Sequence, residues 1–337
     1  MTWETKPLSE VADFCLGKML DAKKNRGEYL PYLANVNVRW GAFELDKLRE
    51  MRFESHELDR FGLQYGDIVM CEGGEPGRCA IWKERVPAMM FQKALHRIRP
   101  FNGVDSRYLF YAFLHKGKTN GFSPLFTGST IKHLPKEKLA KVEVPVPPEE
   151  IQVRITDLLS AYDDLIDNNR RRIELLQQSA RELYKEWFVR FRFPGHEHVK
   201  IVDGVPEGWE FLSMSDVAET IGGGTPSTTK SEYWEDGGLT WFAPKDLTRN
   251  ISLVLLDSEK KITELGLAKS SAKMLPPETI LMSSRASLGY FGIHDFECCT
   301  NQGFISFVPR DTGLKIYLLH NLISLKEAII GLAGGTT

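Results

Sequence analysis

The feature that most constrains this chain is an uninterrupted helical stretch of about 40 residues near its middle. It starts after Pro147-Pro148, where Glu149 and Glu150 suit a helix N-terminus, and it stops before Pro194-Gly195. At 1.5 Å per residue this helix is roughly 60 Å long, more than most single domains need. We therefore expect the rest of the chain to be arranged around it.

The helix carries a coiled-coil seam. Its apolar positions follow four-three spacing through Ile151 and Leu165 to Asn169, a position where a polar residue can fix register; a solvated helix residue is the alternative. Ile173 follows four residues on, where three are expected, which is a stutter. Such a seam must bury against a second long helix or another protein. The predicted subunit-interface residues are Ile155, Leu158, Tyr162, Leu165, Asn169, Ile173, Leu176, Leu183 and Trp187.

An internal repeat relates the segments on the two sides of the helix. WETKPLSEVADFCLGK (3–18) aligns with WEFLSMSDVAETIGGG (209–224), and LQYGDIVM (63–70) aligns with LPPETILM (275–282). In the same alignment Gln92 falls on Gln302, and 107–114 falls on 316–323. We predict two copies of one domain; the alternative is two unrelated domains that share generic strand-turn patterns. The predicted parts are a first domain 1–148, the long helix 149–192, a linker 193–206 and a second domain 207–337.

Each copy shows mixed secondary structure. Segments 106–116 and 313–326 have helical apolar periodicity. Short apolar runs bounded by Gly and Pro turns predict strands at 66–70, 78–82, 95–98, 279–282 and 303–308. This pattern predicts an α+β fold rather than a βαβ sheet.

The second copy stops early relative to the first. FTGST (126–130) continues into the long helix, whereas AGGTT (333–337) stands at the corresponding place and closes the sequence. We therefore expect a second long helix to be missing, and we expect the chain either to self-associate through the unpaired seam or to depend on a partner protein for solubility.

Composition bounds the class of protein. No apolar run reaches the roughly 20 residues that span a bilayer, and MTWETKPLSEV is no secretory signal. The five cysteines lack metal-type spacing, which fits a reducing cytoplasm. Residues 1–148 hold 23 Lys and Arg against 18 Asp and Glu, but residues 193–337 hold 12 against 18. Any nucleic-acid contact must therefore come from local basic loops rather than from a uniformly basic domain.

Three segments resemble one known family. DNNRRRIELLQQSARELYKEWFVRFRFPGHE (167–197) is similar to the central conserved region of the specificity (S) subunit of Type I restriction-modification systems. IGGGTPSTTKSEYWEDGGLTWFAPKDL (221–247) resembles the opening of a target-recognition domain of that family, and FTGSTIKHLPKEKLAKVEVPVPPEEIQ (126–152) resembles the close of one.

The resemblance implies a non-catalytic reader of double-stranded DNA. Its two target-recognition domains would each read half of a bipartite site, held apart by helices that act as a spacer. These helices would also dock two modification (M) subunits, which carry S-adenosylmethionine and methylate adenine. Restriction (R) subunits would add cleavage. The chain itself would hold no cofactor and no metal.

Polar and basic loop residues are the candidates for DNA contact, because loops can bring short side chains close to phosphates and bases. The amide side chains of Gln92, Asn301 and Gln302 suit adenine edges, and Arg39 or Arg285 suits guanine. An ordinary turn or solvated residue is the alternative for each. The first copy offers Asn35, Asn37, Arg39, Arg78, Gln92, Lys93, Ser129, Thr130 and Lys132; the second offers Thr225, Ser227, Lys230, Lys245, Arg249, Ser283, Ser284, Arg285, Asn301 and Gln302.

Several other features keep two interpretations. Gly222–Gly224 could cradle a phosphate or end a strand. Arg170–Arg172 is a solvated face or a subunit contact. The aromatic residues Tyr184 to Phe193 dock the helix onto the second domain or anchor an M subunit.

Two other functions were weighed. A methyltransferase acting alone needs an Asn/Asp-Pro-Pro-aromatic motif or a comparable cofactor loop, and the sequence has none. A coiled-coil scaffold that reads no DNA stays open because the net charge of the chain is near neutral, at -2, and because the second copy stops early.

Overall fold

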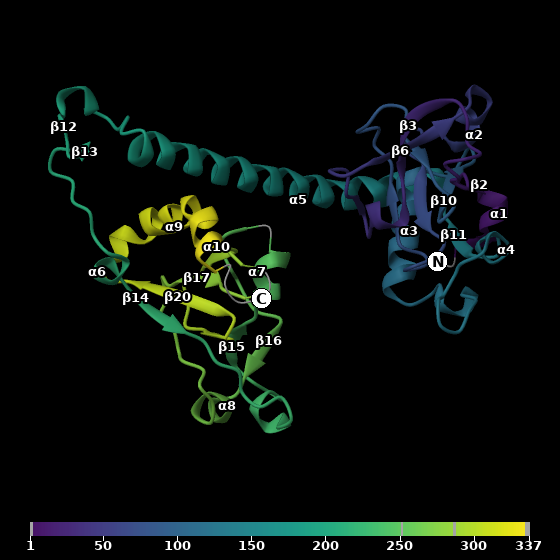
Figure 1. Cartoon of the computed structure of the whole chain (residues 1–337). Coiled ribbons are helices and arrows are strands. Elements are labelled where there is room, and N and C mark those ends of the chain that lie inside the picture. The colour runs from purple at the N-terminus through teal and green to yellow at the C-terminus, as the bar shows by residue number, and fades with distance from the viewer. Residues whose placement is uncertain (1–2, 251, 286–287, 334–337) are drawn as a thin grey trace. The chain divides into compact units, whose positions relative to one another are not determined.

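The computed structural model describes residues 3–250, 252–285 and 288–333 (Figure 1). The chain forms two compact units, the first extending to Leu165 and the second starting at Ile166. The boundary lies within the helix α5 (Glu149–Tyr184), so each unit includes part of this helix.

The first unit is built on a four-stranded antiparallel sheet with the order β2-β10-β7-β8. Its central strand β7 has the sequence IVMC, and all four residues are buried because both faces of the sheet are covered. The strands are β2 (Ala12–Leu16), β7 (Ile68–Cys71), β8 (Cys79–Ile81) and β10 (Leu95–Pro100).

A second sheet of this unit has the order β6-β3-β9. Its strands β3 and β9 are parallel, with Leu33 opposite Phe91. This pairing brings the residue after β9 next to the residues after β3, because parallel strands end at the same edge of a sheet. The strands are β3 (Glu28–Leu33), β6 (Arg49–Phe53) and β9 (Met90–Phe91).

Helix α3 (Ser106–Lys118) packs on the first sheet and fills the core. The Asp105 carboxylate accepts hydrogen bonds from the Arg107 and Tyr108 N–H groups and so caps its N-terminus. Leu109 and Phe113 are fully buried in one cluster with strand residues of β7 and β10. The unit closes where β1 (Glu4–Pro7) pairs with β11 (Glu143–Val146), directly before α5. Shorter elements are α1 (Leu8–Val11), β4 (Val38–Arg39), β5 (Ala42–Phe43), α2 (Leu58–Phe61) and α4 (Lys136–Leu139).

The second unit has the same two sheets in the same orders, β14-β20-β17-β18 and β16-β15-β19. Strands β15 and β19 are again the parallel pair, with Phe242 opposite Thr300. The strands are β14 (Ala218–Gly222), β15 (Leu239–Phe242), β16 (Lys260–Ile262), β17 (Ile280–Ser283), β18 (Phe291–Ile293), β19 (Cys299–Thr300) and β20 (Phe304–Pro309). Helices are α6 (Met214–Val217), α7 (Pro244–Arg249), α8 (Glu264–Ala268), α9 (Lys315–Ser324) and α10 (Lys326–Ala333), and β12 (Ile201–Val202) pairs with β13 (Val205–Pro206).

The shared strand orders confirm the predicted repeat and the α+β fold, but they correct one alignment. The Gln92 N–H donates to Leu33 O (3.1 Å), and the Asn301 N–H donates to Phe242 O (3.0 Å). Gln92 therefore corresponds to Asn301, and not to Gln302 as the sequence alignment had it. The alignment slipped by one residue because few identities flank this turn.

The long helix ends earlier than expected. Its α-helical part stops at Tyr184 and continues as one π-helical stretch, Lys185–Val189. Phe191 then takes a left-handed conformation with φ of 55°. The seam residues through Trp187 thus lie on continuous helix, and the last turn to 192 does not. Within the described residues no helix has both the length and the apolar character to cross a membrane. The predicted early stop at 333–337 concerns residues that, from 334 on, lie outside the described ones.

Candidate nucleic-acid interface

The second unit brings four of its predicted contact residues together at one groove. This groove, of about 420 Å³, lies where α7 begins, at the turn between β19 and β20 and at the segment after β17. Its predicted residues are Lys245, Arg285, Asn301 and Gln302, and Pro244, Thr248 and Gly303 complete the lining. A concave surface with two cations and two amides can contact both phosphates and base edges.

The floor of this groove is a rigid turn. The Asn301 Oδ1 accepts the Gly303 N–H (2.8 Å), so its side chain holds the turn as well as lining the groove. The Ser284 N–H donates to Gly303 O (2.7 Å), which ties the segment after β17 to the same turn. Asn301 therefore has one amide end engaged within the protein.

Gln302 is oriented by Thr225, which follows the strand β14. The Thr225 hydroxyl donates a hydrogen bond to Gln302 Oε1. Gln302 is exposed, and with its carbonyl oxygen engaged by Thr225 the group left for a ligand is its Nε2, a hydrogen-bond donor. Two predicted residues that are far apart in sequence thus form one polar unit at the groove.

The positive charge at the groove is partly balanced. Glu259 pairs with the Arg249 Nη1 (2.6 Å) and lies 3.8 Å from the Lys245 Nζ. All three side chains are more than half exposed, so the pairs are weak and can exchange for phosphate oxygens.

Three other predicted residues of this unit have structural roles. Ser283 is fully buried, and its Oγ accepts the Tyr290 N–H (3.0 Å). Ser227 O accepts the Trp234 indole N–H (3.0 Å), while the Lys230 ammonium donates to the Tyr233 hydroxyl (3.1 Å). Because that hydrogen bond favours the charged form, the pKa of Lys230 is raised.

The glycines before Thr225 favour the strand-end interpretation over a phosphate cradle. A Cβ on Gly223 would lie 2.1 Å from Asn301 O. The Gly224 N–H donates to Thr300 O (2.8 Å), and Gly224 O accepts the Trp241 indole N–H (2.9 Å). These glycines allow two backbone segments to meet, and the Gly224 N–H is not available to a phosphate.

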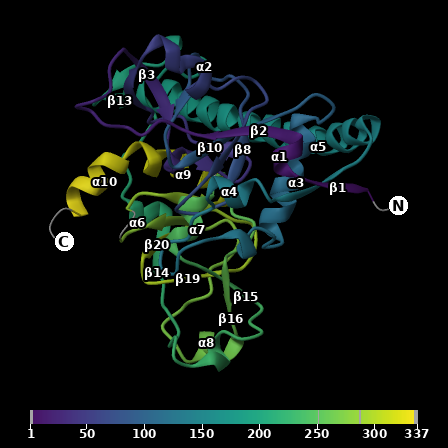
Figure 2. The same cartoon turned by 90° about the vertical axis from the view of Figure 1, so that its right-hand side faces the viewer.

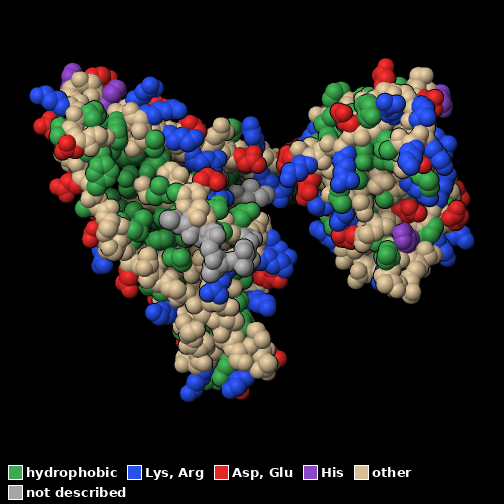
Figure 3. Space-filling model, viewed as in Figure 1, with side chains coloured by type: hydrophobic (Ala, Val, Ile, Leu, Met, Phe, Trp, Pro, Cys, Tyr) green, Lys and Arg blue, Asp and Glu red, His purple; other side chains and the backbone are tan. Residues whose placement is uncertain are grey.

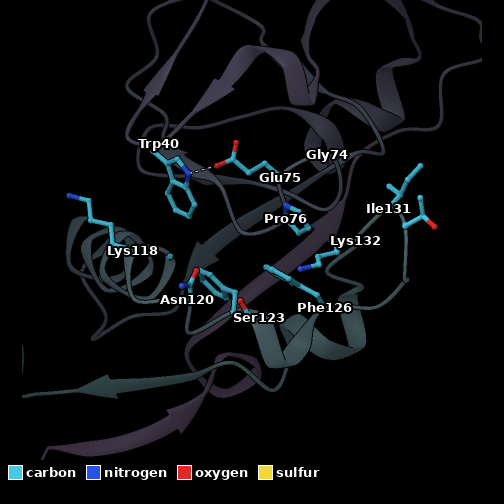
Figure 4. A pocket seen from close by; sticks show the side chains of 13 residues that line it. Trp40, Gly74, Glu75, Pro76, Lys118, Asn120, Ser123, Phe126, Ile131 and Lys132 are labelled. Atoms are coloured by element: carbon cyan, nitrogen blue, oxygen red, sulfur yellow. Dashed lines mark hydrogen bonds between the residues drawn. The ribbon is translucent and has the colours of Figure 1, made fainter. Parts of the chain in front are cut away.

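The first unit has a larger groove, of about 850 Å³, shown in Figure 4. Predicted residues Thr130 and Lys132 line it, together with Trp40, Lys118 and Phe126. Thr130 and Lys132 belong to an exposed loop that also contains Ser129. This loop is closed by two backbone hydrogen bonds between Thr127 and His133 (2.9 and 2.8 Å). Two cations beside two aromatic rings are suited to a nucleic-acid strand.

A hydrogen-bonded chain forms one wall of this groove. The Trp40 indole N–H donates to Glu75 Oε1 (2.6 Å), and the Arg78 Nη1 donates to Glu75 Oε2 (2.7 Å). The Arg78 Nη2 donates to Asn35 O (2.8 Å), and the Arg78 side chain is 14% exposed. Arg78 and the Asn35 backbone thus position the wall, rather than projecting from it.

The remaining candidates of the first unit divide into scaffold and surface. Asn37 is buried, and its amide accepts the Ala34 N–H and donates to Glu44 O (2.9 and 3.0 Å). Arg39 forms a two-pronged ion pair with Glu44, with both distances 2.8 Å. Gln92 and exposed Lys93 occupy the turn that corresponds to Asn301 and Gln302.

Helix α5 exposes its predicted seam. Leu158, Tyr162 and Leu165 are 62%, 62% and 54% exposed, and Leu176 and Leu183 are 67% and 50% exposed. Asn169 is exposed as well, and Ile155 and Trp187 are half-buried. Exposed apolar stripes of this length are typical of interaction surfaces.

A second face of α5 holds the first unit, and sequence reasoning missed it. Gln152 and Thr156 are fully buried. Gln152 Oε1 accepts the Asp105 N–H (2.9 Å), its Nε2 donates to Gly103 O and Pro147 O, and the Tyr111 hydroxyl donates to Asp163 Oδ2 (2.7 Å). Polar residues in a helix give no burial signal, so the sequence alone could not have indicated this face.

In the second unit the end of α5 is docked by aromatic rings. Phe188 lies 4.8 Å from the Tyr317 ring, between centroids, and the Asn321 amide donates to the Tyr184 hydroxyl (3.0 Å). This confirms the docking interpretation for these two rings. Phe188, Phe191 and Phe193 also pack around Trp209.

The surface offers a further apolar area. Figure 3 shows hydrophobic side chains gathered on one side of the second unit. The segment after α5 contributes exposed apolar residues, namely Val189, Ile201, Val202, Phe211 and Leu212.

Among the described residues, one group has side chains close enough together to hold a metal ion, namely Glu54, His56 and Glu57. The Lys18 ammonium already pairs with Glu57.

Comparison with known proteins gives consistent matches. The family model for the Type I restriction modification DNA specificity domain matches residues 1–178 and 206–337. The MjaIX specificity subunit of Methanocaldococcus jannaschii is 33% identical over 153 residues, which are 45% of this chain and 35% of that protein. The putative MjaX specificity subunit of the same organism is 23% identical over 346 residues, which cover 99% of this chain and 78% of that protein.

Two further matches extend this picture. The EcoR124I/EcoR124II specificity subunit of Escherichia coli is 30% identical over 131 residues, which are 38% of this chain and 32% of that protein. The crystal structure of the S subunit of a Type I restriction-modification system from M. genitalium shares the fold, with a TM-score of 0.57 and 16% identity, over 98% of this chain and 79% of that one.

Proposed function

Because this chain belongs to the Type I restriction modification DNA specificity family, we propose that its two domains each read one half of a bipartite DNA site. It is a DNA specificity subunit, the non-catalytic component of its enzyme.

The observation that carries the proposal is the duplicated turn after the parallel strand pair. In both units a polar residue, Gln92 or Asn301, follows this pair and is fixed by the same backbone hydrogen bond. Lys93 and Gln302 come next and are exposed. Two copies of one surface turn with different side chains suit two half-sites of different sequence.

Each half-site would be read by two kinds of contact. Lys245, Arg249 and Arg285 would neutralise phosphates, which gives affinity but carries no sequence information. Gln302, held by Thr225, would direct its Nε2 toward a base acceptor such as guanine O6 or thymine O4. In the first domain, Gln92, Lys93, Thr130 and Lys132 would have these roles.

The exposed seam of α5 would receive partner proteins. Leu158, Tyr162 and Leu165 are more than half exposed, and among the described residues nothing covers them. We assign this seam to a second long helix and to modification subunits. The modification subunits would supply S-adenosylmethionine and methylate adenine. Restriction subunits would complete the complex, which would act in the cytoplasm. Where these are missing, two copies of this chain would associate through the same seam.

A scaffold that reads no DNA is the second candidate, favoured by the acidic second half of the sequence and by the same seam. Selection from a random duplex pool by the chain bound to its modification subunits separates the two. Enrichment of two short motifs at a fixed separation supports reading by both domains. Enrichment of one motif assigns reading to one domain, and no enrichment supports the scaffold.

A further inference from the structure

Helix α5 is attached to the first domain by a short set of polar contacts, which we call the α3–α5 clamp. It comprises Gln152 and Asp163 on α5 with Asp105 and Tyr111 at α3. An ion pair adds to it, because the Arg107 Nη2 lies 3.4 Å from Asp157 Oδ1. All of these residues belong to the first unit.

The amide of Gln152 permits one arrangement. It is fully buried, its Oε1 accepts the Asp105 N–H, and its Nε2 donates to Gly103 O (3.1 Å) and Pro147 O (2.9 Å). Both hydrogens of the Nε2 are therefore used. Any rotation of the helix that broke these bonds would leave a buried polar group unpaired, at a cost in free energy. A helix held by apolar contacts alone would not incur this cost when it rotates.

Tyr111 fixes the helix a second time, three turns further along. Its hydroxyl donates to Asp163 Oδ2 (2.7 Å), and burial together with this carboxylate raises the pKa of Tyr111, so the hydroxyl keeps its proton. Gln152 and Asp163 are 11 positions apart, or about 16 Å along the helix axis. The clamp thus fixes a direction as well as a point.

The leverage of the clamp is large. A shift of about 1 Å at one of its two ends turns the axis by about 3.5°, given the 16 Å separation. Over the 36 residues of α5, about 54 Å, this moves the far end by about 3 Å. One base pair of DNA occupies about 3.4 Å, so the displacement caused by a small slip in the clamp is of the same size as one base-pair step.

We propose that the α3–α5 clamp determines how many base pairs between the two half-sites this protein accepts, with Tyr111, Gln152 and Asp163 as positioning residues. The inference rests on the proposed reading of a bipartite site. Helix length sets the approximate separation, and the clamp sets how strictly that separation is enforced.

The test measures spacing separately from sequence. The wild-type chain with its modification subunits first selects its two motifs from a random duplex pool. A second pool then carries these motifs with every separation from several base pairs shorter to several longer. For Tyr111→Phe we expect the same motifs, while the preference for the best separation over its neighbours falls about two- to tenfold, the value of one hydrogen bond.

Controls are available within the same domain. Tyr29→Phe removes the hydroxyl of an exposed tyrosine that lies outside both the clamp and the seam of α5, and it should leave the spacing preference unchanged. Asp163→Asn keeps an acceptor oxygen for Tyr111 and should retain most of the preference. Thermal unfolding of each variant verifies that the first domain is folded.

Each outcome decides something. An equally sharp spacing preference in Tyr111→Phe overturns the inference, as does a wild-type chain that accepts all separations equally. Equal broadening in Tyr29→Phe also overturns it. If the wild-type chain selects no motif at all, the proposed function itself fails, which is a different result from these three.

Discussion

Tyr111 and His320 occupy equivalent positions in the two repeats, and each contacts the central helix. The Tyr111 hydroxyl donates to Asp163 in the first half of α5, whereas the His320 ring stacks on Tyr184 at its end, with ring centroids 6.0 Å apart. The same position of the repeat therefore contacts different halves of the helix, by a directed hydrogen bond in one unit and by ring packing in the other.

The aromatic attachment predicts a graded loss of stability. Tyr184 is 7% exposed, so Tyr184→Ala should lower the free energy of unfolding of the second unit by about 3 kcal/mol. Tyr184→Phe loses the bond from Asn321 and should cost about 1 kcal/mol. Chemical denaturation and hydrogen exchange in α9 measure both. Equal effects of the two substitutions would contradict the assignment.

The apolar seam of α5 predicts loss of binding without loss of stability. Leu165 and Leu176 are 54% and 67% exposed, so changing both to Gln should alter the free energy of unfolding by less than about 1 kcal/mol. Light scattering should show less self-association of the isolated chain, and pull-down should show loss of modification subunits. Leu109→Ala, in the core, is the opposite control: it should unfold the first domain.

Acid should destabilise the protein through its buried histidines. Burial lowers the pKa of His96 and of His294, which are 0% and 1% exposed. A pKa lowered by folding means that the unfolded chain binds protons more readily. Stability is therefore complete above the unfolded value of about 6.5 and falls below it, by up to about 1.4 kcal/mol per pH unit for each histidine.

The histidine effect is measured by unfolding at pH values from 8 to 5. His96→Gln should flatten the dependence, since the amide can still donate to Leu134 O, which His96 Nε2 contacts at 2.9 Å. An unchanged slope in His96→Gln would argue against this residue as the source.

Phosphate contacts at the second-domain groove should appear in the salt dependence of binding. Lys245→Ala should weaken all DNA sequences alike and reduce the slope of log K against log salt by about 1. Lys273→Ala removes an exposed lysine of the same unit that does not line the groove. A slope changed equally by both substitutions would show that general charge, and not the groove, is responsible.

Gln302 should read one base pair. Gln302→Ala is expected to relax the selected motif at one position, corresponding to about 1–3 kcal/mol of discrimination. Thr225→Val frees the amide to rotate and should weaken discrimination at that same position. Ser227→Ala lies outside the groove and serves as the control. A uniform loss of affinity in place of a position-specific change would assign Gln302 to phosphate contact.

The large features of the fold followed from the sequence because their signals are local and repeated. The helix between Pro148 and Pro194 needs periodicity alone, and the repeat needs the order of several strands. The equivalence of Gln92 with Asn301 was out of reach, since it depends on the register of parallel strands that lie far apart in sequence.

Candidate residues were harder to sort for the same reason. Asn37 and Lys132 are both polar loop residues in the sequence, but Asn37 is buried in loop hydrogen bonds whereas Lys132 is exposed at a groove. Helix α5 also inverts the usual pattern, because its polar Gln152 faces the domain and its apolar Leu158 faces outward. Only tertiary contacts distinguish these cases.

The pairing of β1 with β11 has a consequence for synthesis on the ribosome. Residues Glu4–Pro7, the strand β1 labelled beside the N-terminus in Figure 2, pair with Glu143–Val146, so β1 has no partner strand until nearly the whole domain has been made. At about 5–20 residues per second, this wait is on the order of ten seconds. During that time an unpaired strand edge is exposed. The nascent chain is therefore most prone to aggregation, and most dependent on chaperones, while the first domain is incomplete.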